Sequence, residues 1–400
     1  MGMSRREVLS AGAVAAGSLV TAPLFGNTAA AADTPSEAED AASDDNGDRV
    51  RARELGVAPG QWPTGPDNGI TDVEGVRVGQ VTLFDGDDVR TGVTAVLPHA
   101  GNLFQDKVAG AVHVANGFGK LAGSTQVVEL GNIETPVILT NTLSVAAGLD
   151  GAVQWSLAQP DNDTVASVNA VVGETNDSAL NDIRGQHVTA DHVIEAIEQA
   201  SADPIAEGSV GAGTGTTCFG WKGGIGTSSR AVDDYTLGVL VQSNYGGALT
   251  IDGVPFWDEL EPDTADAVAD EADQGSIIIV VATDAPLSPR NLDRLGARSL
   301  FAMSRTGAGY TNGSGDYAVA FSTAEEVRTE HGSSDIRTMQ ELPNDGMSDL
   351  FAAVQEATEE AIYNSMFMAT TVTGHGGTTR QAIPLGQVRR ILRRYGRGRG

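Results

Sequence analysis

The sequence has a single cysteine. Cys218 stands alone in 400 residues, which excludes an intrachain disulfide framework and any cysteine-rich zinc site. A thiol is chemically able to act as a nucleophile. The neighbouring Phe219 and Trp221 instead favour a buried, small apolar role for Cys218.

Positive charge is also scarce. Asp and Glu number 53 against 25 Lys and Arg, and only Lys107, Lys120 and Lys222 are lysines. Dense carboxylates stay hydrated in strong salt, which screens their mutual repulsion, so a net charge of −28 predicts adaptation to high salt. The same charge argues against nucleic acid as the main partner. We interpret the one basic segment, residues 389–400, as a solvated or subunit-contacting end.

The chain lacks a strong membrane-span pattern. The apolar stretch within residues 1–32 is rich in Ala and Gly and is interrupted by Pro23, which makes it a weak transmembrane candidate. The preceding Arg5 and Arg6 indicate a twin-arginine export signal, with cleavage expected near residues 31–32. We therefore expect an extracellular or cell-surface protein with no membrane span after signal removal.

After the signal, the composition changes twice. Residues 33–58 are mostly acidic and polar, which predicts a disordered linker. From residue 59 onward, short apolar runs recur among many glycines. Six runs have the character of strands: residues 108–119, 135–145, 165–174, 236–247, 275–286 and 317–323. Nearly continuous apolar strands need cover on both faces, so a layered α/β fold is predicted.

Three segments between the strands are predicted to be helices. Thr189 is expected to cap the first, whose apolar residues follow at 193–197. Ser288 and Pro289 open the second, because proline is tolerated in the first turn of a helix. Ser348 is expected to cap the third.

Several common catalytic and cofactor motifs are missing. The glycine-rich segment 208–230 is not a Walker loop, because Lys222 is followed by Gly223 rather than Ser or Thr. The six histidines include no HExxH pair, and His187 and His192 are expected to be exposed or capping. No metal and no cofactor is expected. No GxSxG elbow is present, although a Ser-His-Asp triad needs no local spacing and stays open.

The junction between Gly275 and Ser276 poses a question. A small polar residue stands directly before the β-branched run 277–281. The simpler interpretation is a loop that ends where a strand begins. The alternative is that the chain is cut there. Ser276 would then carry a free α-amine with a pKa of about 7.7–8.0 beside its hydroxyl.

A second polar cluster lies in the sequence NGSGD, residues 312–316. Ser314 and Asp316 are two residues apart, which places both side chains on one face of an extended segment. A carboxylate that holds one hydroxyl is able to relay a proton from another. From the pattern alone, a simple turn remains the other interpretation.

Eight motifs, in order over residues 60–380, resemble the L-aminopeptidase/D-amino-acid esterase and β-peptidyl aminopeptidase family of N-terminal-serine hydrolases. They are GFGK, ELGNIETPVILTNTLSV, VVGETND, LNDIRGQHVT, GTGTTCFGWKGGIGTSSR, VQSNYGG, GSIIIVVATDAPL and TNGSGDYAVAFST. The resemblance implies a four-layer αββα sandwich, similar to N-terminal nucleophile hydrolases but with different connectivity. It also implies self-cleavage at Gly275-Ser276. Residues 59–275 and 276–400 would be two subunits of one domain, assembled as a tetramer of cleaved heterodimers.

The resemblance also implies catalytic roles. Ser276 matches the nucleophile, first for self-cleavage and then for the substrate. Ser314 and Asp316 match the hydroxyl and carboxylate that orient and activate it. Asn244 matches the residue at the oxyanion, where a side-chain amide is a suitable donor.

Two further positions match substrate-binding residues of the family. Glu174 matches a carboxylate that would hold the free ammonium of the substrate, which explains exopeptidase behaviour. Asn176 stands where some relatives have a tyrosine that assists the transition state. This departure leaves the rate and the substrate preference of this chain open.

The favoured function is an exported aminopeptidase that acts on short peptides, amino-acid amides or esters through an acyl-enzyme on Ser276. One alternative is an acetyltransferase similar to ornithine acetyltransferases, but those begin their new chain with threonine, and an export signal does not suit arginine synthesis. The other alternative is a non-catalytic exported binding protein. The sequence leaves open the preference among L-, D- and β-amino substrates.

Overall fold

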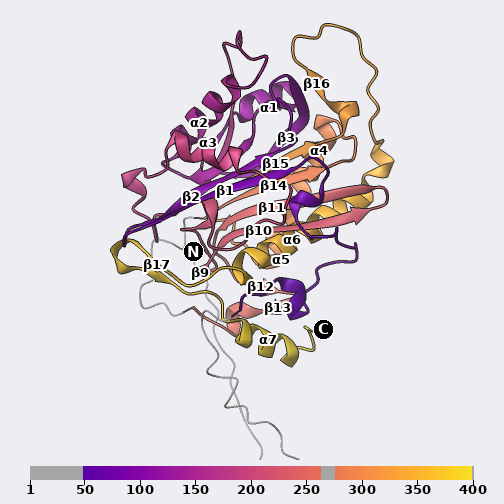
Figure 1. The fold of residues 1–400 in the computed structure, drawn as a ribbon. Coiled ribbons are helices and arrows are strands. Elements are labelled where there is room, and N and C mark those ends of the chain that lie inside the picture. Colours follow the sequence, from indigo (N-terminus) through magenta and orange to yellow (C-terminus); the bar gives the residue numbers. More distant parts are fainter. Residues whose placement is uncertain (1–47, 263–274, 399–400) are drawn as a thin grey trace, which may run out of the picture. The chain divides into compact units, whose positions relative to one another are not determined.

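Two β-sheets and the helices that cover them make up most of the described chain (Figure 1). The computed structural model describes residues 48–262 and 275–398. The predicted export signal, residues 1–32, and residues 33–47 of the predicted linker lie outside the described residues. Among the described helices, none has the length and apolar character needed to cross a bilayer.

The first sheet has five strands in the order β1-β2-β6-β7-β4. Their bounds are β1 Arg77–Asp85, β2 Val89–Leu97, β6 Val137–Asn141, β7 Val171–Thr175 and β4 Leu121–Ala122. The β6 and β7 strands run parallel, and the other neighbours pair antiparallel. Since parallel strands need a crossover connection, the helix between β6 and β7 in the chain makes a βαβ unit.

The second sheet has seven strands, in the order β10-β11-β14-β15-β3-β16, with β5 also paired to β3. Their bounds are β10 Gly224–Val232, β11 Tyr235–Asn244, β14 Ser276–Thr283, β15 Gly315–Ser322, β3 Asp106–Gly117, β16 Thr329–Glu330 and β5 Asn132–Ile133. Here β14 and β15 are the parallel pair. Three short hairpins complete the strands: β8 Thr217–Cys218 with β9 Trp221–Lys222, β12 Thr250–Ile251 with β13 Val254–Pro255, and β17 Val372–Thr373 with β18 Thr379–Arg380.

Seven α-helices are described: α1 Ser124–Leu130, α2 Val145–Leu157, α3 Ala190–Glu198, α4 Pro289–Ser299, α5 Phe301–Thr306, α6 Ser348–Phe367 and α7 Leu385–Arg394. Helices α2 and α3 pack on the first sheet, whereas α4 and α6 pack on the second (Figure 1). The layers are therefore helix, sheet, sheet, helix, as the expected αββα sandwich requires.

The alternation of side chains along β14 shows how the layers are held together. Ile277, Ile279 and Val281 pack in the core between the second sheet and its helices. Ile278 and Val280 point the other way, into the core between the two sheets. Successive side chains of a strand point to opposite faces, so a strand covered on both sides favours a nearly continuous apolar run over an alternating pattern.

The predicted helix starts are correct in two cases and off by one in the third. Thr189 caps α3, and its side chain accepts a hydrogen bond from the His192 backbone N–H. Ser288 is the N-cap of α4, with Pro289 in the first turn. Ser348, however, is the first residue of α6, and the cap position belongs to Met347. Sequence pattern does not resolve single residues at helix ends.

The predicted end of the disordered linker, at residue 58, is wrong. Residues 48–58 pack against the domain, with Leu55 only 2% exposed and a 3-10 turn at Ala52–Leu55. The Ala52 N–H donates to Asn364 Oδ1, and the Arg49 guanidinium donates to backbone carbonyls at the end of α6. These partners are some 310 residues away in the chain, so local composition does not reveal them.

The basic segment at the end of the chain also contains a helix. Val388 and Leu392 of α7 are buried, while its arginines lie on the other face. Arg394 pairs with Glu259, and Tyr395 donates to the same carboxylate at 2.6 Å. The apolar residues of α7 recur at helical spacing, a pattern that an interpretation of the basic segment by its charge alone did not use.

Candidate active site

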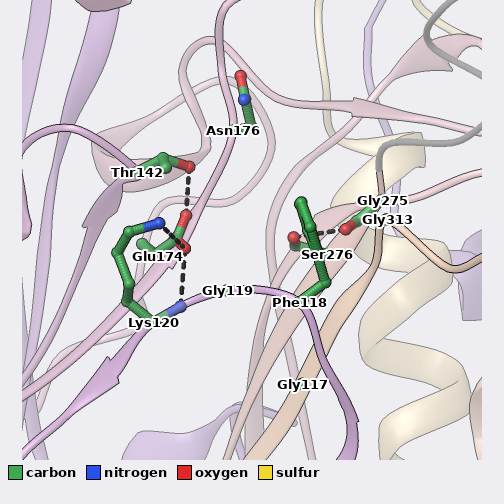
Figure 2. A pocket seen from close by; sticks show the side chains of 10 residues that line it. All are labelled: Gly117, Phe118, Gly119, Lys120, Thr142, Glu174, Asn176, Gly275, Ser276 and Gly313. Atoms are coloured by element: carbon green, nitrogen blue, oxygen red, sulfur yellow. Dashed lines mark hydrogen bonds and ion pairs between the residues drawn. The ribbon is translucent and has the colours of Figure 1, made fainter.

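A pocket of about 250 Å³ opens where β3 and β11 end and where β14 and β15 begin. Residues of both sheets line it: Gly117, Phe118, Gly119, Lys120, Thr142, Glu174, Asn176, Gly275, Ser276 and Gly313 (Figure 2). Thr142 and Glu174 come from the ends of β6 and β7 in the first sheet. Two residues predicted as substrate-binding, Glu174 and Asn176, therefore line the same pocket as Ser276.

The Ser276 hydroxyl lies against the peptide bond that precedes it. Ser276 Oγ donates a hydrogen bond to the Gly275 carbonyl oxygen at 2.5 Å (Figure 2). The Gly315 backbone N–H donates to the same oxygen at 3.1 Å and lies 3.4 Å from Ser276 Oγ. Two donors on one carbonyl oxygen polarise that carbonyl and stabilise negative charge that develops on it.

Ser314 and Asp316 form a buried pair beside this junction. Ser314 Oγ donates to Asp316 Oδ1 at 2.6 Å, and neither residue is more than 2% exposed. A methyl group at Gly275 would lie 3.3 Å from Ser314 Oγ, which shows how close this hydroxyl is to the junction. Burial raises the pKa of Asp316, and the hydrogen bond from Ser314 opposes that effect. No group in the described ranges donates to Asp316 Oδ2.

Asn244 is the last residue of β11 and pairs directly with Ser276 of β14. Its Oδ1 accepts a hydrogen bond from the Thr217 backbone N–H at 2.9 Å. Because the oxygen is held in this way, the NH2 group is the end of the amide that is left to donate. This orientation suits a donor to an oxyanion.

Glu174 is the buried acid of the pocket, with 3% of its surface exposed. Glu174 Oε1 accepts from the Lys120 backbone N–H at 2.9 Å, and Lys120 Nζ lies 3.6 Å from the same oxygen. The Thr142 hydroxyl donates to Oε2 (Figure 2). This set holds a negative charge in a fixed position beside the serine.

Asn176 follows β7 directly and lies at the side of the pocket (Figure 2). Its Oδ1 accepts from the Ser178 backbone N–H at 2.9 Å. An amide in this place is a neutral donor with a shorter reach than a tyrosine hydroxyl. The pocket also has one exposed apolar side chain, Phe118, which is 64% exposed.

Sequence reasoning assigned no role to four groups of this site: the backbone amides of Gly315 and Thr217, the Thr142 hydroxyl and the Lys120 ammonium. A backbone amide has no side-chain signal, so the sequence offered nothing for the first two. Lys120 and Thr142 stand within the motifs GFGK and ELGNIETPVILTNTLSV, and this membership was the signal that the sequence offered.

Other candidate groups lie away from this chemistry. Cys218 is fully buried, and burial raises the pKa of its thiol to about 12, so the reactive thiolate is suppressed. His187 contacts Asp182 at 3.3 Å, and His192 contacts the Thr189 backbone. In residues 48–262 and 275–398, no group of three or more His, Cys, Asp or Glu side chains is placed to hold a metal ion.

Comparison with protein families gives one match over most of the chain. Residues 68–380 match the family described as Peptidase family S58. The chain belongs to this family. This S58 peptidase is similar to the beta-peptidyl aminopeptidase BapA of Sphingosinicella microcystinivorans, with 41% identity over 374 residues, which cover 87% of this chain and 93% of that relative.

Solved structures give the same result. The PH0078 protein of Pyrococcus horikoshii OT3 is 47% identical, with a TM-score of 0.81 over 87% of this chain and 100% of the other. The L-aminopeptidase D-Ala-esterase/amidase of Ochrobactrum anthropi is 36% identical, with a TM-score of 0.81 over 87% of this chain and 99% of the other. Its structure is described as a prototype for the serine aminopeptidases and a new variant among the Ntn hydrolase fold.

These similarities confirm two predictions. The mixed α/β fold of the S58 peptidase is a variant of the N-terminal nucleophile hydrolase fold, and the protein is a hydrolase of the aminopeptidase class. The two alternatives, an acetyltransferase and a non-catalytic binding protein, are correspondingly disfavoured.

Proposed function

We propose that this S58 peptidase cleaves its own chain between Gly275 and Ser276. The new N-terminal serine then removes N-terminal residues from short peptides, amino-acid amides or esters. One observation carries the proposal: the Ser276 hydroxyl lies 2.5 Å from the Gly275 carbonyl oxygen, which also accepts the Gly315 N–H. Nucleophile, electrophile and oxyanion donor are thus assembled around one peptide bond.

Self-cleavage proceeds by an N→O acyl shift. Ser276 Oγ bonds to the Gly275 carbonyl carbon and gives up its proton, for which the buried Ser314–Asp316 pair provides a relay to a carboxylate. The C–N bond breaks, and the nitrogen takes a proton to become the α-amine of Ser276. Water then hydrolyses the Gly275–Ser276 ester. The products are a Gly275 carboxylate and a serine with a free amine and a free hydroxyl.

Substrate turnover repeats these steps on an external carbonyl. The α-amine of Ser276, with an ordinary pKa of about 7.7–8.0, takes the proton as Oγ attacks. The leaving amine or alcohol departs with a proton, and water hydrolyses the acyl-enzyme. Asn244 donates to the oxyanion. Gly275 lines the pocket in the uncut chain, so cleavage vacates the space that the substrate carbonyl needs.

Glu174 supplies the preference for a free N-terminus. Its carboxylate is buried and has an exposed cation, Lys120, at 3.6 Å, so the site already accommodates an ammonium group beside it. A substrate ammonium in this position forms charge-assisted hydrogen bonds that an acylated N-terminus does not offer. The expected products are therefore single residues released from the N-terminal end of short chains.

The proposal extends to the setting in which the enzyme works. Arg5 and Arg6 support export by the twin-arginine route to the extracellular side of the membrane. The net charge of −28 supports activity and folding in strong salt. The family resemblance supports assembly as a tetramer of cleaved heterodimers. Mass measurement of the secreted N-terminus, activity across a salt series and light scattering test these three statements.

Denaturing electrophoresis with mass measurement of the active enzyme tests the self-cleavage. Two pieces are expected, the smaller beginning at Ser276 and containing the 125 residues 276–400. An active, uncut chain would contradict the proposal.

The Ser276→Ala variant should fold, remain uncut and hydrolyse no aminoacyl anilide. Ser322→Ala is a matched control, because Ser322 is a buried serine of the same sheet that lies next to the opposite end of β14. This control should be cut and active. Normal hydrolysis by Ser276→Ala would refute the mechanism.

A further inference from the structure

Lys222 is a buried lysine of β9, in the hairpin whose Thr217 N–H donates to Asn244. Its side chain is fully buried, and Nζ donates to the Gly213 and Gly223 carbonyl oxygens, each at 2.8 Å. In the part of the chain that the structure describes, no carboxylate lies at ion-pair distance from this ammonium. The ammonium thus donates to two backbone carbonyls of the glycine-rich segment 208–230.

Burial of this side chain costs free energy. A charged ammonium removed from water loses hydration that two neutral carbonyls only partly replace. Burial accordingly lowers the pKa of Lys222 to about 7, while the buried Asp177 carboxylate acts in the opposite direction. An apolar residue of similar size would stabilise the core at least as well. The contacts that Lys222 makes therefore indicate why a lysine is present here.

Lys222 holds the hairpin that orients Asn244. The β8–β9 hairpin places Thr217 directly opposite Lys222. The Gly223 N–H donates to the Thr216 carbonyl at 3.1 Å, and the Thr217 N–H donates to Asn244 Oδ1 at 2.9 Å. The ammonium therefore holds the β8–β9 hairpin, and the Thr217 backbone amide of that hairpin fixes the orientation of the Asn244 side chain.

The packing leaves this hairpin little freedom while Lys222 is in place. A methyl group at Gly223 would lie 2.7 Å from the Ser243 carbonyl oxygen and 3.0 Å from the Thr217 carbonyl carbon. The glycine-rich backbone thus approaches β11 very closely. Gly213 and Gly223 have no side chains that could pack and hold this segment. Hydrogen bonds such as those from Lys222 Nζ therefore set its position.

We propose that Lys222 is a positioning residue for the S58 aminopeptidase reaction. It holds the β8–β9 hairpin so that Asn244 presents its NH2 group to the oxyanion. The inference rests on the proposed function, in which Asn244 is the oxyanion donor. Lys222 itself is a buried residue of the hairpin and does not line the pocket. Its effect acts through Asn244, and a small displacement of that donor is enough to slow the chemical step.

The Lys222→Met variant tests the proposal, because methionine has a similar shape and no N–H donor. The expected result is a fall in kcat of about ten- to hundredfold with KM nearly unchanged, the size typical of a lost orienting partner. Rates on an aminoacyl anilide are normalised to the amount of cleaved chain, since slower self-cleavage is also expected. Lys222→Arg, which keeps N–H donors, should restore part of kcat.

Lys107→Met is the matched control. Lys107 is also a buried lysine that donates to a backbone carbonyl, that of Phe104, and it pairs with Glu134. It lies at the start of β3, whereas the pocket lies at the Gly117 end of that strand, about 30 Å away along the chain direction. Lys107→Met should lower the melting temperature without lowering kcat of the cleaved enzyme. An equal loss of kcat in both variants would indicate a general packing effect and overturn the proposal.

A double-mutant cycle with Asn244→Ala separates the outcomes. If Lys222 acts through Asn244, Lys222→Met should cause almost no further loss of kcat in the Asn244→Ala background. If the kcat of the double variant falls by the product of the two single-variant factors, the inference is overturned and the proposed function is unaffected. If Asn244→Ala alone leaves kcat unchanged, the proposed role of Asn244 fails, and the inference fails with it. Should Lys222→Met not fold, Lys222→Leu, which also lacks an N–H donor, takes its place in the same cycle.

Discussion

Asn244 and Ser276 are direct partners across the antiparallel strands β11 and β14. Strand β11 ends and strand β14 begins at this pair, and Ser276 lines the pocket there. Strand pairing fixes their backbones to each other by hydrogen bonds that run the length of both strands. A proposed nucleophile and a proposed oxyanion donor are therefore held next to each other by paired strands in the interior of the second sheet.

Glu174→Gln should weaken the preference for a free N-terminus. We expect kcat/KM for aminoacyl anilides to fall roughly ten- to hundredfold, the size of a lost charge-assisted hydrogen bond, mainly through KM. Self-cleavage requires no ammonium and should continue. Glu198→Gln, on α3 and away from the pocket lining, is the control. A larger relative loss with N-acetylated substrates would contradict the role of Glu174.

Lys120→Met should have the opposite effect. Lys120 Nζ lies 3.6 Å from Glu174 Oε1, where it competes with the substrate ammonium. Its side chain is half exposed, so solvent screens the pair and the change is small. We expect KM for aminoacyl anilides to fall about two- to fivefold in steady-state assays at low salt, with the difference shrinking as salt is added. A rise in KM would show instead that Lys120 binds part of the substrate.

The pH dependence should identify Asp316. Because burial raises its pKa, the acid limb of kcat/KM should lie above the ordinary pH range of an aspartate, and activity should rise as Asp316 ionises. The free energy of unfolding depends on this ionisation in the opposite direction and falls as pH rises. A raised folded-state pKa contributes stability that is fully present below the unfolded value and is lost as pH rises through the folded value.

Asp316→Asn separates these two effects. The variant should lose most of its activity at every pH, while its melting temperature at neutral pH stays equal to or above that of the parent. The dependence of its melting temperature on acid pH should also be flatter. A variant that is strongly destabilised at neutral pH would show that the ionised carboxylate stabilises the fold.

Gly315→Ala should slow self-cleavage. A methyl group there would lie 2.9 Å from the Phe118 carbonyl oxygen and 3.0 Å from the Tyr317 ring, so the Gly315 amide has to shift away from the Gly275 carbonyl. Loss of a well-placed oxyanion donor costs roughly a hundred- to thousandfold in rate, which a time course on gels will resolve. Gly246→Ala is the control, because a methyl group there meets no atom within 4 Å. Equal rates in both variants would exclude the Gly315 amide from the step.

Leu55→Ala tests the packed segment before residue 59. Leu55 is 2% exposed, so its truncation should lower the free energy of unfolding by about 2–5 kcal/mol in a denaturant titration. Leu157→Ala, at a residue that is 40% exposed, should change it by less than about 0.5 kcal/mol. Similar small effects at both positions would mean that residues 48–58 contribute little to the fold.

Local pattern was sufficient to predict much of the fold. The strand that begins at Ser276 is apolar from Ile277 to Ala282 because both of its faces are covered, and this pattern is visible in the sequence itself. Thr189 and Ser288-Pro289 were correctly placed at helix starts because a cap depends on a few neighbouring residues. The packing of residues 48–58 was missed because their partners on α6 are far away in the chain.

The sequence by itself determined which residues to examine: a Gly-Ser directly before a buried strand, and ordered motifs that contain Glu174, Asn244, Ser314 and Asp316. Only the tertiary structure decided how these residues meet. The Gly315 amide contacts the Gly275 carbonyl, the Thr217 amide contacts Asn244, and Lys222 contacts the Gly213 carbonyl. These contacts join segments that the fold brings together. Backbone donors have no side-chain identity, and contacts across sheets have no fixed spacing in the chain, so three-dimensional packing alone specifies them.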